Sequence, residues 1–75
     1  MNAARRKELS KAIDLIEQAK EIISAVAEEE REAYDNLPEG LQESEMGEKM
    51  NEIADDLEYI DLDEVVDTIQ EIIER

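Results

Sequence analysis

The feature that most constrains this chain is the stretch from Ala3 to Asn36, which contains neither proline nor glycine. Its apolar residues recur every three or four positions, the spacing that aligns side chains on one face of an α-helix. This pattern predicts a single helix over about residues 3–36, roughly 50 Å long at about 1.5 Å per residue. The apolar positions are Leu9, Ala12, Ile13, Ile16, Ala19, Ile23, Val26, Ala33 and Leu37.

The apolar stripe of this segment is wider than a two-stranded coiled coil needs, because Leu15 and Ile22 flank its heptad positions. Such a width suits a bundle of three or four helices. The chain has 75 residues, no cysteine and two aromatic side chains. A chain of this size buries only about 60% of the surface that it exposes when unfolded. We therefore expect self-association to complete its core.

The strongest break in the sequence is the segment 36–40, Asn-Leu-Pro-Glu-Gly. Pro38 disfavours helical backbone at the residue before it, and glycine permits a positive φ. We therefore expect a turn over residues 37–43. Ser44 then fits the N-cap of a second helix over about residues 44–60. Together these two helices predict a long antiparallel hairpin.

The apolar pattern of the last third changes phase after Ile60. Apolar residues beyond it are centred about 120° further round a straight helix than those before it. Asp61 followed by Glu64 resembles a capping box. We therefore predict a kink or break near residue 61, followed by a short helix over about residues 62–74. The alternative is one long helix whose last part packs against a different neighbour.

The predicted fold class is all-α. It consists of one helical domain over residues 1–75, a coiled-coil-like hairpin that a second copy completes as a homodimeric helical bundle. The residues expected in the core or at the dimer contact carry apolar side chains at helical spacing. They are Leu9, Ile13, Ile16, Ile23, Val26, Met50, Ile53, Leu57, Ile69 and Ile73.

The absence of histidine and cysteine excludes zinc sites, haem ligation and catalysis that uses these side chains. Asp61–Asp67 has the acidic residues of a calcium loop but lacks the central glycine. We therefore expect no enzyme, metal or cofactor. A net charge of −15 repels nucleic-acid phosphates, so no direct nucleic-acid binding is expected. No apolar run reaches the roughly 20 residues of a membrane span, and no signal peptide is expected.

Charge is distributed unevenly along the chain: residues 1–20 carry a net charge of +2 and residues 21–75 carry −17. In a hairpin, the basic N-terminal cluster lies beside the acidic C-terminal helix. We expect the two to pair; contact with phosphate or anionic lipid is the alternative. The basic residues are Arg5, Arg6, Lys7 and Lys11, and the acidic ones are Asp63, Glu64, Asp67, Glu71 and Glu74.

Acidic residues form strips at helical spacing on both long helices, repeating every 5–6 Å or so. Two such strips could imitate a nucleic-acid backbone and attract a basic groove. The alternative is a solvated face that only keeps the protein soluble. The candidate partner-binding residues add one tyrosine beside the turn. They are Glu28, Glu32, Tyr34, Asp35, Glu45, Glu48, Glu52, Asp55 and Asp56.

Two further residues depart from the pattern. Glu30 occupies an a position of the first helix, where it must reach solvent, Lys49 or Arg31 of a partner chain, or else fix the register. Gly47 lies in the first turn of the second helix, where it costs about 1 kcal/mol relative to alanine. We expect Gly47 to permit close approach of the first helix or of a partner chain.

The segment 32–50 resembles small acidic helical proteins of bacteriophages and prophages. The resemblance lies in an aromatic residue, a Leu-Pro-Glu turn, Leu-Gln, Ser-Glu, Gly-Glu and Met. In this chain these are Tyr34, Leu37, Pro38, Glu39, Leu41, Gln42, Ser44, Glu45, Gly47, Glu48 and Met50. The phase break after Ile60 departs from the uninterrupted heptads of that group.

The resemblance implies a phage-type protein in the cytoplasm of a bacterial host, where inhibitors of defence systems are common. Combined with the acidic strips, it predicts a non-catalytic inhibitor of a basic nucleic-acid-handling protein, such as a nuclease. The alternative is a structural or assembly coiled-coil adaptor without mimicry, whose partner is another helix. Self-association is expected in either case.

Overall fold

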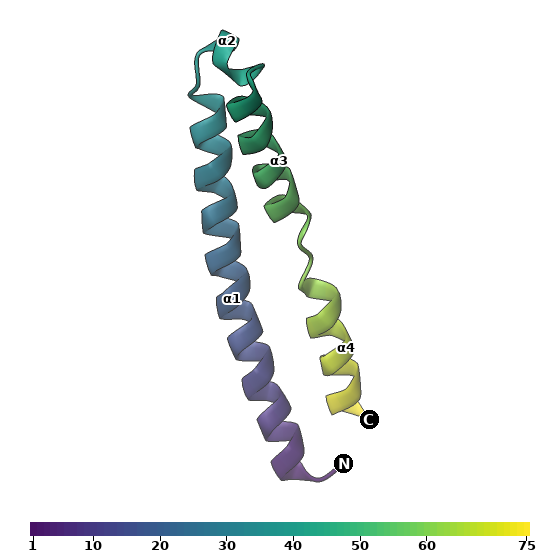
Figure 1. Ribbon diagram of the computed structural model, residues 1–75. Helices are drawn as coiled ribbons and strands as arrows, with labels where there is room; N and C mark the ends of the chain where they lie inside the picture. Colours follow the sequence, from purple (N-terminus) through teal and green to yellow (C-terminus); the bar gives the residue numbers. More distant parts are fainter. The chain divides into compact units, whose positions relative to one another are not determined.

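A computed structural model describes all residues, 1–75, and contains four helices and no strand. The helices are α1 (Ala3–Asp35), α2 (Glu39–Gln42), α3 (Glu45–Tyr59) and α4 (Asp63–Glu74). The all-α class predicted from the sequence is confirmed. Figure 1 shows that α2 follows α1 directly after the turn and that the chain leaves the helix between α3 and α4.

The predicted turn over residues 37–43 contains α2, a single helical turn. Pro38 precedes it with φ −55° and ψ 145°, an extended conformation in keeping with a residue that has no N–H to donate. Its carbonyl accepts hydrogen bonds from the N–H groups of Leu41 and Gln42, at 2.8 and 3.1 Å. Proline thus ends one helix and begins the next within a few residues.

Side-chain caps mark the beginnings of the longer helices. Asn2 Oδ1 accepts from the backbone N–H of Arg5 at 2.8 Å, and Ser44 Oγ accepts from that of Gly47 at 3.2 Å. Asp61 Oδ1 accepts from the N–H of Asp63 at 2.9 Å. These bonds satisfy N–H groups that have no partner within their own helix.

The expected capping box at Asp61 is only half formed. Asp61 contributes its side chain, but Glu64 returns no hydrogen bond to it, and Leu62 occupies the cap position itself with φ −96° and ψ −7°. Ile60 has an extended backbone, with φ −65° and ψ 121°. The helix is therefore interrupted by Ile60 and restarts with Asp61 bonded to its first turn.

The chain divides into two compact units. One comprises Met1–Glu21 and Asp61–Arg75, here called the terminal unit. The other comprises Ile22–Ile60 and is called the turn unit. α1 contributes its first part to the terminal unit and its last part to the turn unit.

Contacts within the terminal unit join the first part of α1 to α4. Arg6 Nε donates to the backbone carbonyl of Ile73 at 3.1 Å, and Lys20 forms an ion pair with Asp63. The later residue on α1, Lys20, contacts the earlier residue on α4, Asp63. The two segments are therefore antiparallel.

The predicted pairing of the basic cluster with the acids of α4 is wrong in its details. Arg6 binds a carbonyl at the C-terminal end of α4, where free carbonyls and the helix dipole favour a cation. Lys11 pairs instead with Glu8 on its own helix, at 3.3 Å. Arg5 and Lys7 form no ion pair. Lys20, outside the predicted cluster, makes the one ion pair to α4.

Small residues alone are buried in the turn unit. Ala27 on α1 and Ala54 on α3 are 6% and 0% exposed, and Gly47 is the third buried residue. An alanine side chain is covered only by a close neighbour, which indicates that α1 and α3 approach closely there. No large apolar side chain in the protein is fully buried.

The ten predicted core residues are therefore only partly covered by this chain. Val26 and Ile53 are exposed, at 40% and 49%, and the other eight are half-buried. Leu15 and Ile22, which flank the predicted stripe, are 65% and 66% exposed. A single chain thus leaves much of its apolar surface in contact with water.

Candidate functional site

Arg31 links α1 to α3 through four hydrogen bonds within the turn unit. Its Nη1 donates to Asn51 Oδ1 at 2.7 Å, and its Nη2 donates to Asp55 Oδ1 at 2.6 Å. Glu58 accepts from Nη2 at 2.8 Å and from Nε at 3.3 Å, so both of its carboxylate oxygens are used. The guanidinium carbon also lies 5.8 Å from the centre of the Tyr34 ring, within range of a cation–π interaction. We call Arg31, Asn51, Asp55 and Glu58 the Arg31 cluster.

These bonds shift the protonation equilibria of the cluster. The hydrogen bond from Arg31 holds the pKa of Glu58 below its usual value near 4.5, with the positive charge acting in the same direction. The hydrogen bonds to Glu58 and Asp55 raise the pKa of Arg31 further. The Glu58 carboxylate therefore stays ionised at neutral pH, and the guanidinium of Arg31 partly balances its charge.

Neither Arg31 nor its ligands Asn51 and Glu58 stood out in the sequence analysis. Arg31 was considered there only as a possible partner of Glu30 in another chain. The available signal was that Arg31 is the only basic residue between Lys20 and Lys49. Within this unit, it is therefore the only base on α1 that can pair with the acids of α3.

The turn beside this cluster is built by residues of the 32–50 motif described in the sequence analysis. Gln42 Nε2 donates to the carbonyls of Tyr34, Asp35 and Leu37, at 3.2, 3.3 and 3.2 Å. These carbonyls lie at or just beyond the end of α1, where no helical N–H reaches them. Ser44 Oγ also donates to the carbonyl of Leu41. The motif therefore has a structural role in this chain.

Gly47 owes its place to the backbone of α2. A Cβ atom there would lie 2.3 Å from the carbonyl oxygen of Leu41 and 2.4 Å from that of Gln42. The atoms that such a Cβ would meet first belong to α2 and not to the first helix, so a close approach of the first helix is not the reason for this glycine. The close neighbour is the preceding turn of its own chain.

Two different flanks of the turn unit follow from helix geometry. Successive residues of a helix are rotated by about 100° around its axis. Measured around α1 from buried Ala27, Arg31 lies about 40° to one side. Ile23 and Val26 lie on the other side, at about 40° and 100°. On α3, counted from buried Ala54, Glu58 and Asp55 lie about 40° and 100° to one side. The same count puts three apolar residues on the opposite side, at about 80° to 120°: Met46, Ile53 and Ile60.

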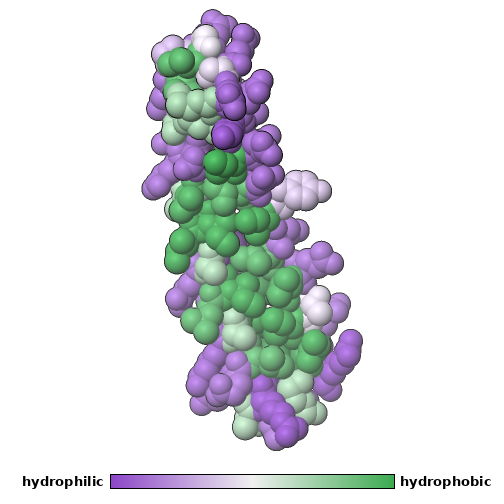
Figure 2. All heavy atoms as spheres, in the orientation of Figure 1, coloured by the Kyte–Doolittle hydropathy of each residue, from purple (hydrophilic) through white to green (hydrophobic).

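Because Arg31 bonds to Asp55 and Glu58, the polar sides of the two helices form one flank of the unit. The apolar sides must then share the other flank. Figure 2 shows a band of hydrophobic side chains bordered by hydrophilic ones on the face in view. We call the exposed large residues of this side the apolar flank; they are Ile22, Val26, Met46, Ile53 and Ile60, between 40% and 66% exposed.

The predicted partner-binding carboxylates all lie in the turn unit, and all eight are exposed. Asp55 alone among them is held in an ion pair. The other seven have no basic side chain within ion-pairing distance. Tyr34, the ninth residue of that set, is half-buried against Arg31. Glu30 also has no ion pair in this chain and is half-buried.

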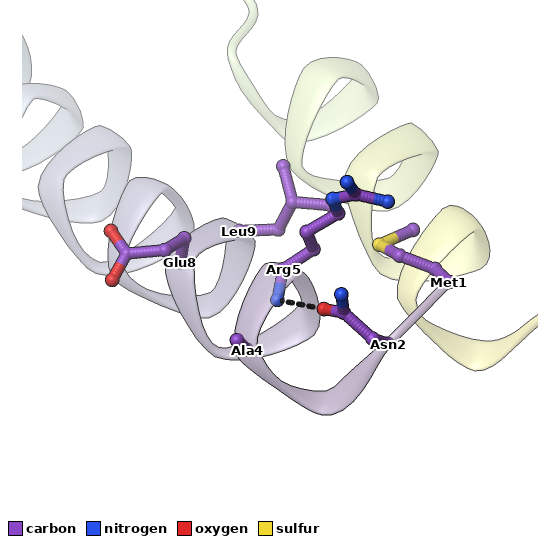
Figure 3. Close-up of a pocket in the computed structure, with 6 residues that line it drawn as sticks. All are labelled: Met1, Asn2, Ala4, Arg5, Glu8 and Leu9. Atoms are coloured by element: carbon purple, nitrogen blue, oxygen red, sulfur yellow. Dashed lines mark hydrogen bonds between the residues drawn. The ribbon is translucent and has the colours of Figure 1, made fainter.

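The terminal unit has a shallow hollow at the beginning of α1. It is lined by Met1, Asn2, Ala4, Arg5, Glu8 and Leu9. Figure 3 shows that Met1, Arg5 and Leu9 lie toward α4, whereas Glu8 points away. The Glu8 carboxylate pairs with Lys11 and forms no ion pair with Arg5. No group of three or more metal-binding side chains gathers anywhere in the protein, and none of its helices combines the length and apolarity of a membrane span.

Comparison with family models, with curated proteins and with solved structures finds no match to this chain. The two flanks of the turn unit differ in their chemistry. One flank carries unpaired carboxylates around the Arg31 cluster, and the other carries exposed apolar side chains.

Proposed function

We propose that this protein is a non-catalytic binding protein whose acidic residues engage a basic surface of a nucleic-acid-handling protein. The observation that carries the proposal is that seven of the eight candidate carboxylates are exposed without a basic partner. Bound to a groove that normally holds nucleic acid, the protein would exclude the natural ligand. It would act as an inhibitor by occupancy, possessing no chemistry of its own.

The charge distribution supports this proposal. Only four of the 23 acidic residues form ion pairs within the chain: Glu8, Asp55, Glu58 and Asp63. The remaining negative field steers a basic partner over distances up to the Debye length, about 10 Å at 0.1 M salt. The resulting gain is mainly in the association rate.

The Arg31 cluster supports the proposal in a second way. By joining α1 to α3, it sets the acidic residues of the two helices at a fixed separation. Glu28, Glu32 and Asp35 come from α1, and Glu48 and Glu52 come from α3. Carboxylates held in place before binding cost less ordering entropy on association.

The context proposed for this activity is a phage-type inhibitor that acts on a defence protein in the bacterial cytoplasm. It rests on the resemblance of segment 32–50 to small phage and prophage proteins. The complete antiparallel hairpin and its homodimeric bundle form part of the same proposal. Each unit contributes contacts between α1 and a later helix, and the exposed apolar residues favour the dimer.

A helical adaptor is the second candidate function. The observation that favours it is the apolar flank, because Ile22, Ile53 and Ile60 offer another helix the contacts that this chain leaves open. An adaptor of this kind binds through apolar packing. Its binding therefore depends little on salt and is lost when an apolar side chain is made polar.

The experiment is capture of partners from a nuclease-treated bacterial lysate with three immobilised proteins, read by mass spectrometry. The first is the unchanged chain. The second is Glu48→Gln/Glu52→Gln/Asp56→Asn, which spares Asp55 because that residue binds Arg31. The third, Asp14→Asn/Asp67→Asn/Glu71→Gln, removes the same charge from exposed acids of the terminal unit.

The proposal predicts one basic nucleic-acid-binding protein that is captured by the unchanged chain and the third variant but not by the second. Equal capture by all three would falsify binding through the acidic strip of α3. Salt-resistant capture of another helical protein, lost in Ile53→Glu, would support the adaptor instead.

A further inference from the structure

The charged residues closest to the apolar flank are one acid and one base. Counted from Ala27, Glu30 lies on the apolar side of α1 at about 60°. Counted from Ala54, Lys49 lies on the apolar side of α3 at about 140°. The next nearest acids, Glu29 and Asp56, lie at about 160° and point almost directly away from the partner helix. Neither Glu30 nor Lys49 has an ion-pair partner in this chain.

We propose that the apolar flank is the interface with a second copy of this chain, in which Glu30 of each copy pairs with Lys49 of the other. This inference rests on the self-association proposed above and is independent of the basic partner.

Two-fold symmetry accounts for the complementarity. A two-fold axis parallel to the helices exchanges their two positions, so α1 of one copy lies over α3 of the other. Glu30 on α1 then faces the helix that carries Lys49, and the same contact occurs twice. A flank with one acid on one helix and one base on the other is therefore self-complementary.

The chain as a whole exposes more surface than a compact monomer of its size, which leaves room for an interface with a second copy. The chain exposes 5833 Å². A compact folded monomer of 8.6 kDa is expected to expose about 4,700 Å². The excess of roughly 1,100 Å² compares with the 800 Å² or so that each partner buries in a stable complex.

The position of Glu30 also fits this interface. A half-buried carboxylate beside Ile23 and Val26 weakens an apolar contact unless a cation meets it. Arg31, the adjacent base, is committed to Asp55 and Glu58 on the opposite flank. Lys49 is the only other basic residue of the turn unit, so Lys49 of the other copy is the cation available to Glu30.

Most of the charge does not oppose this dimer at close range. Apart from Glu30, the acids of the turn unit lie on the polar flank or point outward, and only their long-range repulsion must be overcome. Added salt screens that repulsion. The dimer should therefore tighten as salt rises from low to moderate concentration, whereas binding of a basic partner should weaken.

The test is sedimentation equilibrium of the full chain and of charge-exchanged variants. We expect the unchanged chain to dimerise, and Glu30→Lys and Lys49→Glu each to raise the dimer dissociation constant about tenfold, because like charges then face each other twice. The double variant Glu30→Lys/Lys49→Glu restores opposite charges and should return to within about threefold of the unchanged chain. Far-UV circular dichroism checks that each variant stays helical.

The matched controls are Glu29→Lys and Lys7→Glu, which make the same charge changes outside the flank and should leave the dimer intact. A dimer that is indifferent to Glu30→Lys and Lys49→Glu would overturn the pairing but leave the self-association. A chain that stays monomeric at about 100 μM, where a dimer with a micromolar dissociation constant would be assembled, would overturn both. Neither result affects the basic partner, whose test is capture by the acidic strip.

Discussion

Arg31 and Glu58 form a two-point contact in which Nη2 and Nε of the guanidinium each bind one carboxylate oxygen, at 2.8 and 3.3 Å. The contact joins α1 to α3 on the flank opposite the exposed apolar residues. A two-point contact fixes orientation as well as distance, because the planar guanidinium and carboxylate match only when coplanar. The Arg31 cluster therefore defines which sides of the two helices stay free.

Replacing Arg31 with Gln should lower the melting temperature of the protein. The substitution removes the bonds to Asp55 and Glu58 and leaves two neighbouring carboxylates without a cation. Thermal unfolding followed by circular dichroism measures the effect. Arg5→Gln is the control, since the Arg5 side chain makes no ion pair; an equal loss in both variants would show that Arg31 has no special role.

The contribution of Glu58 should depend on pH. Its pKa is lowered in the folded state by the hydrogen bond from Arg31, so its stabilising effect is present above its usual value near 4.5. The effect disappears as the pH falls through the lower, folded-state value. The difference in melting temperature between the unchanged chain and Glu58→Gln should therefore be constant from pH 7 to 5 or so and shrink below about pH 4.

This difference isolates Glu58 from the rest of the charge. Protonation of the other acids relieves repulsion in both proteins alike and cancels in the comparison. A difference that grows on acidification would contradict the assignment.

Gly47→Ala should destabilise the protein, although alanine is normally the better helix former by about 1 kcal/mol. The new Cβ would lie 2.3 Å from the carbonyl oxygen of Leu41, and backbone cannot move as a flexible side chain does. We expect a loss of about 1–3 kcal/mol, the range of overpacked sites. Chemical denaturation measures it.

Gly40 supplies the control for that prediction. A Cβ at Gly40 meets no atom within 4 Å, and its backbone does not have a positive φ. Gly40→Ala should therefore be neutral or stabilising. If both alanine variants behaved alike, the close approach of α2 to Gly47 would be refuted.

Gln42→Ala should loosen the end of α1. The side chain loses its bonds to the carbonyls of Tyr34, Asp35 and Leu37, at a cost of about 1–2 kcal/mol. Gln18→Ala, at an exposed helical position, is the control and should change little. Faster amide hydrogen exchange confined to the residues around the turn would support this role, and uniform exchange across α1 would argue against it.

The helices were predictable because their signals are local. A helix over 3–36 was expected and α1 covers Ala3–Asp35. Ser44 has the side chain and position of an N-cap, and it caps α3 in the structure. The change of apolar phase after Ile60 coincides with the interruption between α3 and α4. Each of these depends on residues within a few positions of one another.

The contacts between helices were not predictable in the same way, because they depend on register. Arg31 meets Glu58 across 27 positions, and Arg6 meets the carbonyl of Ile73 across 67. The distribution of charge along the sequence suggested that the N-terminal basic residues pair with the acidic residues of α4. It does not show which residues of the two helices lie at the same height along the helix axes. The role of Gly47 was missed because the sequence does not show that the carbonyls of Leu41 and Gln42 are aimed at that position.

The most direct test of the proposed function is the salt dependence of affinity for the captured basic partner, measured by calorimetry between about 50 and 300 mM NaCl. The account predicts affinity that falls steeply as salt rises, with a shallower slope for Glu48→Gln/Glu52→Gln/Asp56→Asn than for the unchanged chain. An affinity that stays constant across this range, and is equal for both proteins, would contradict it.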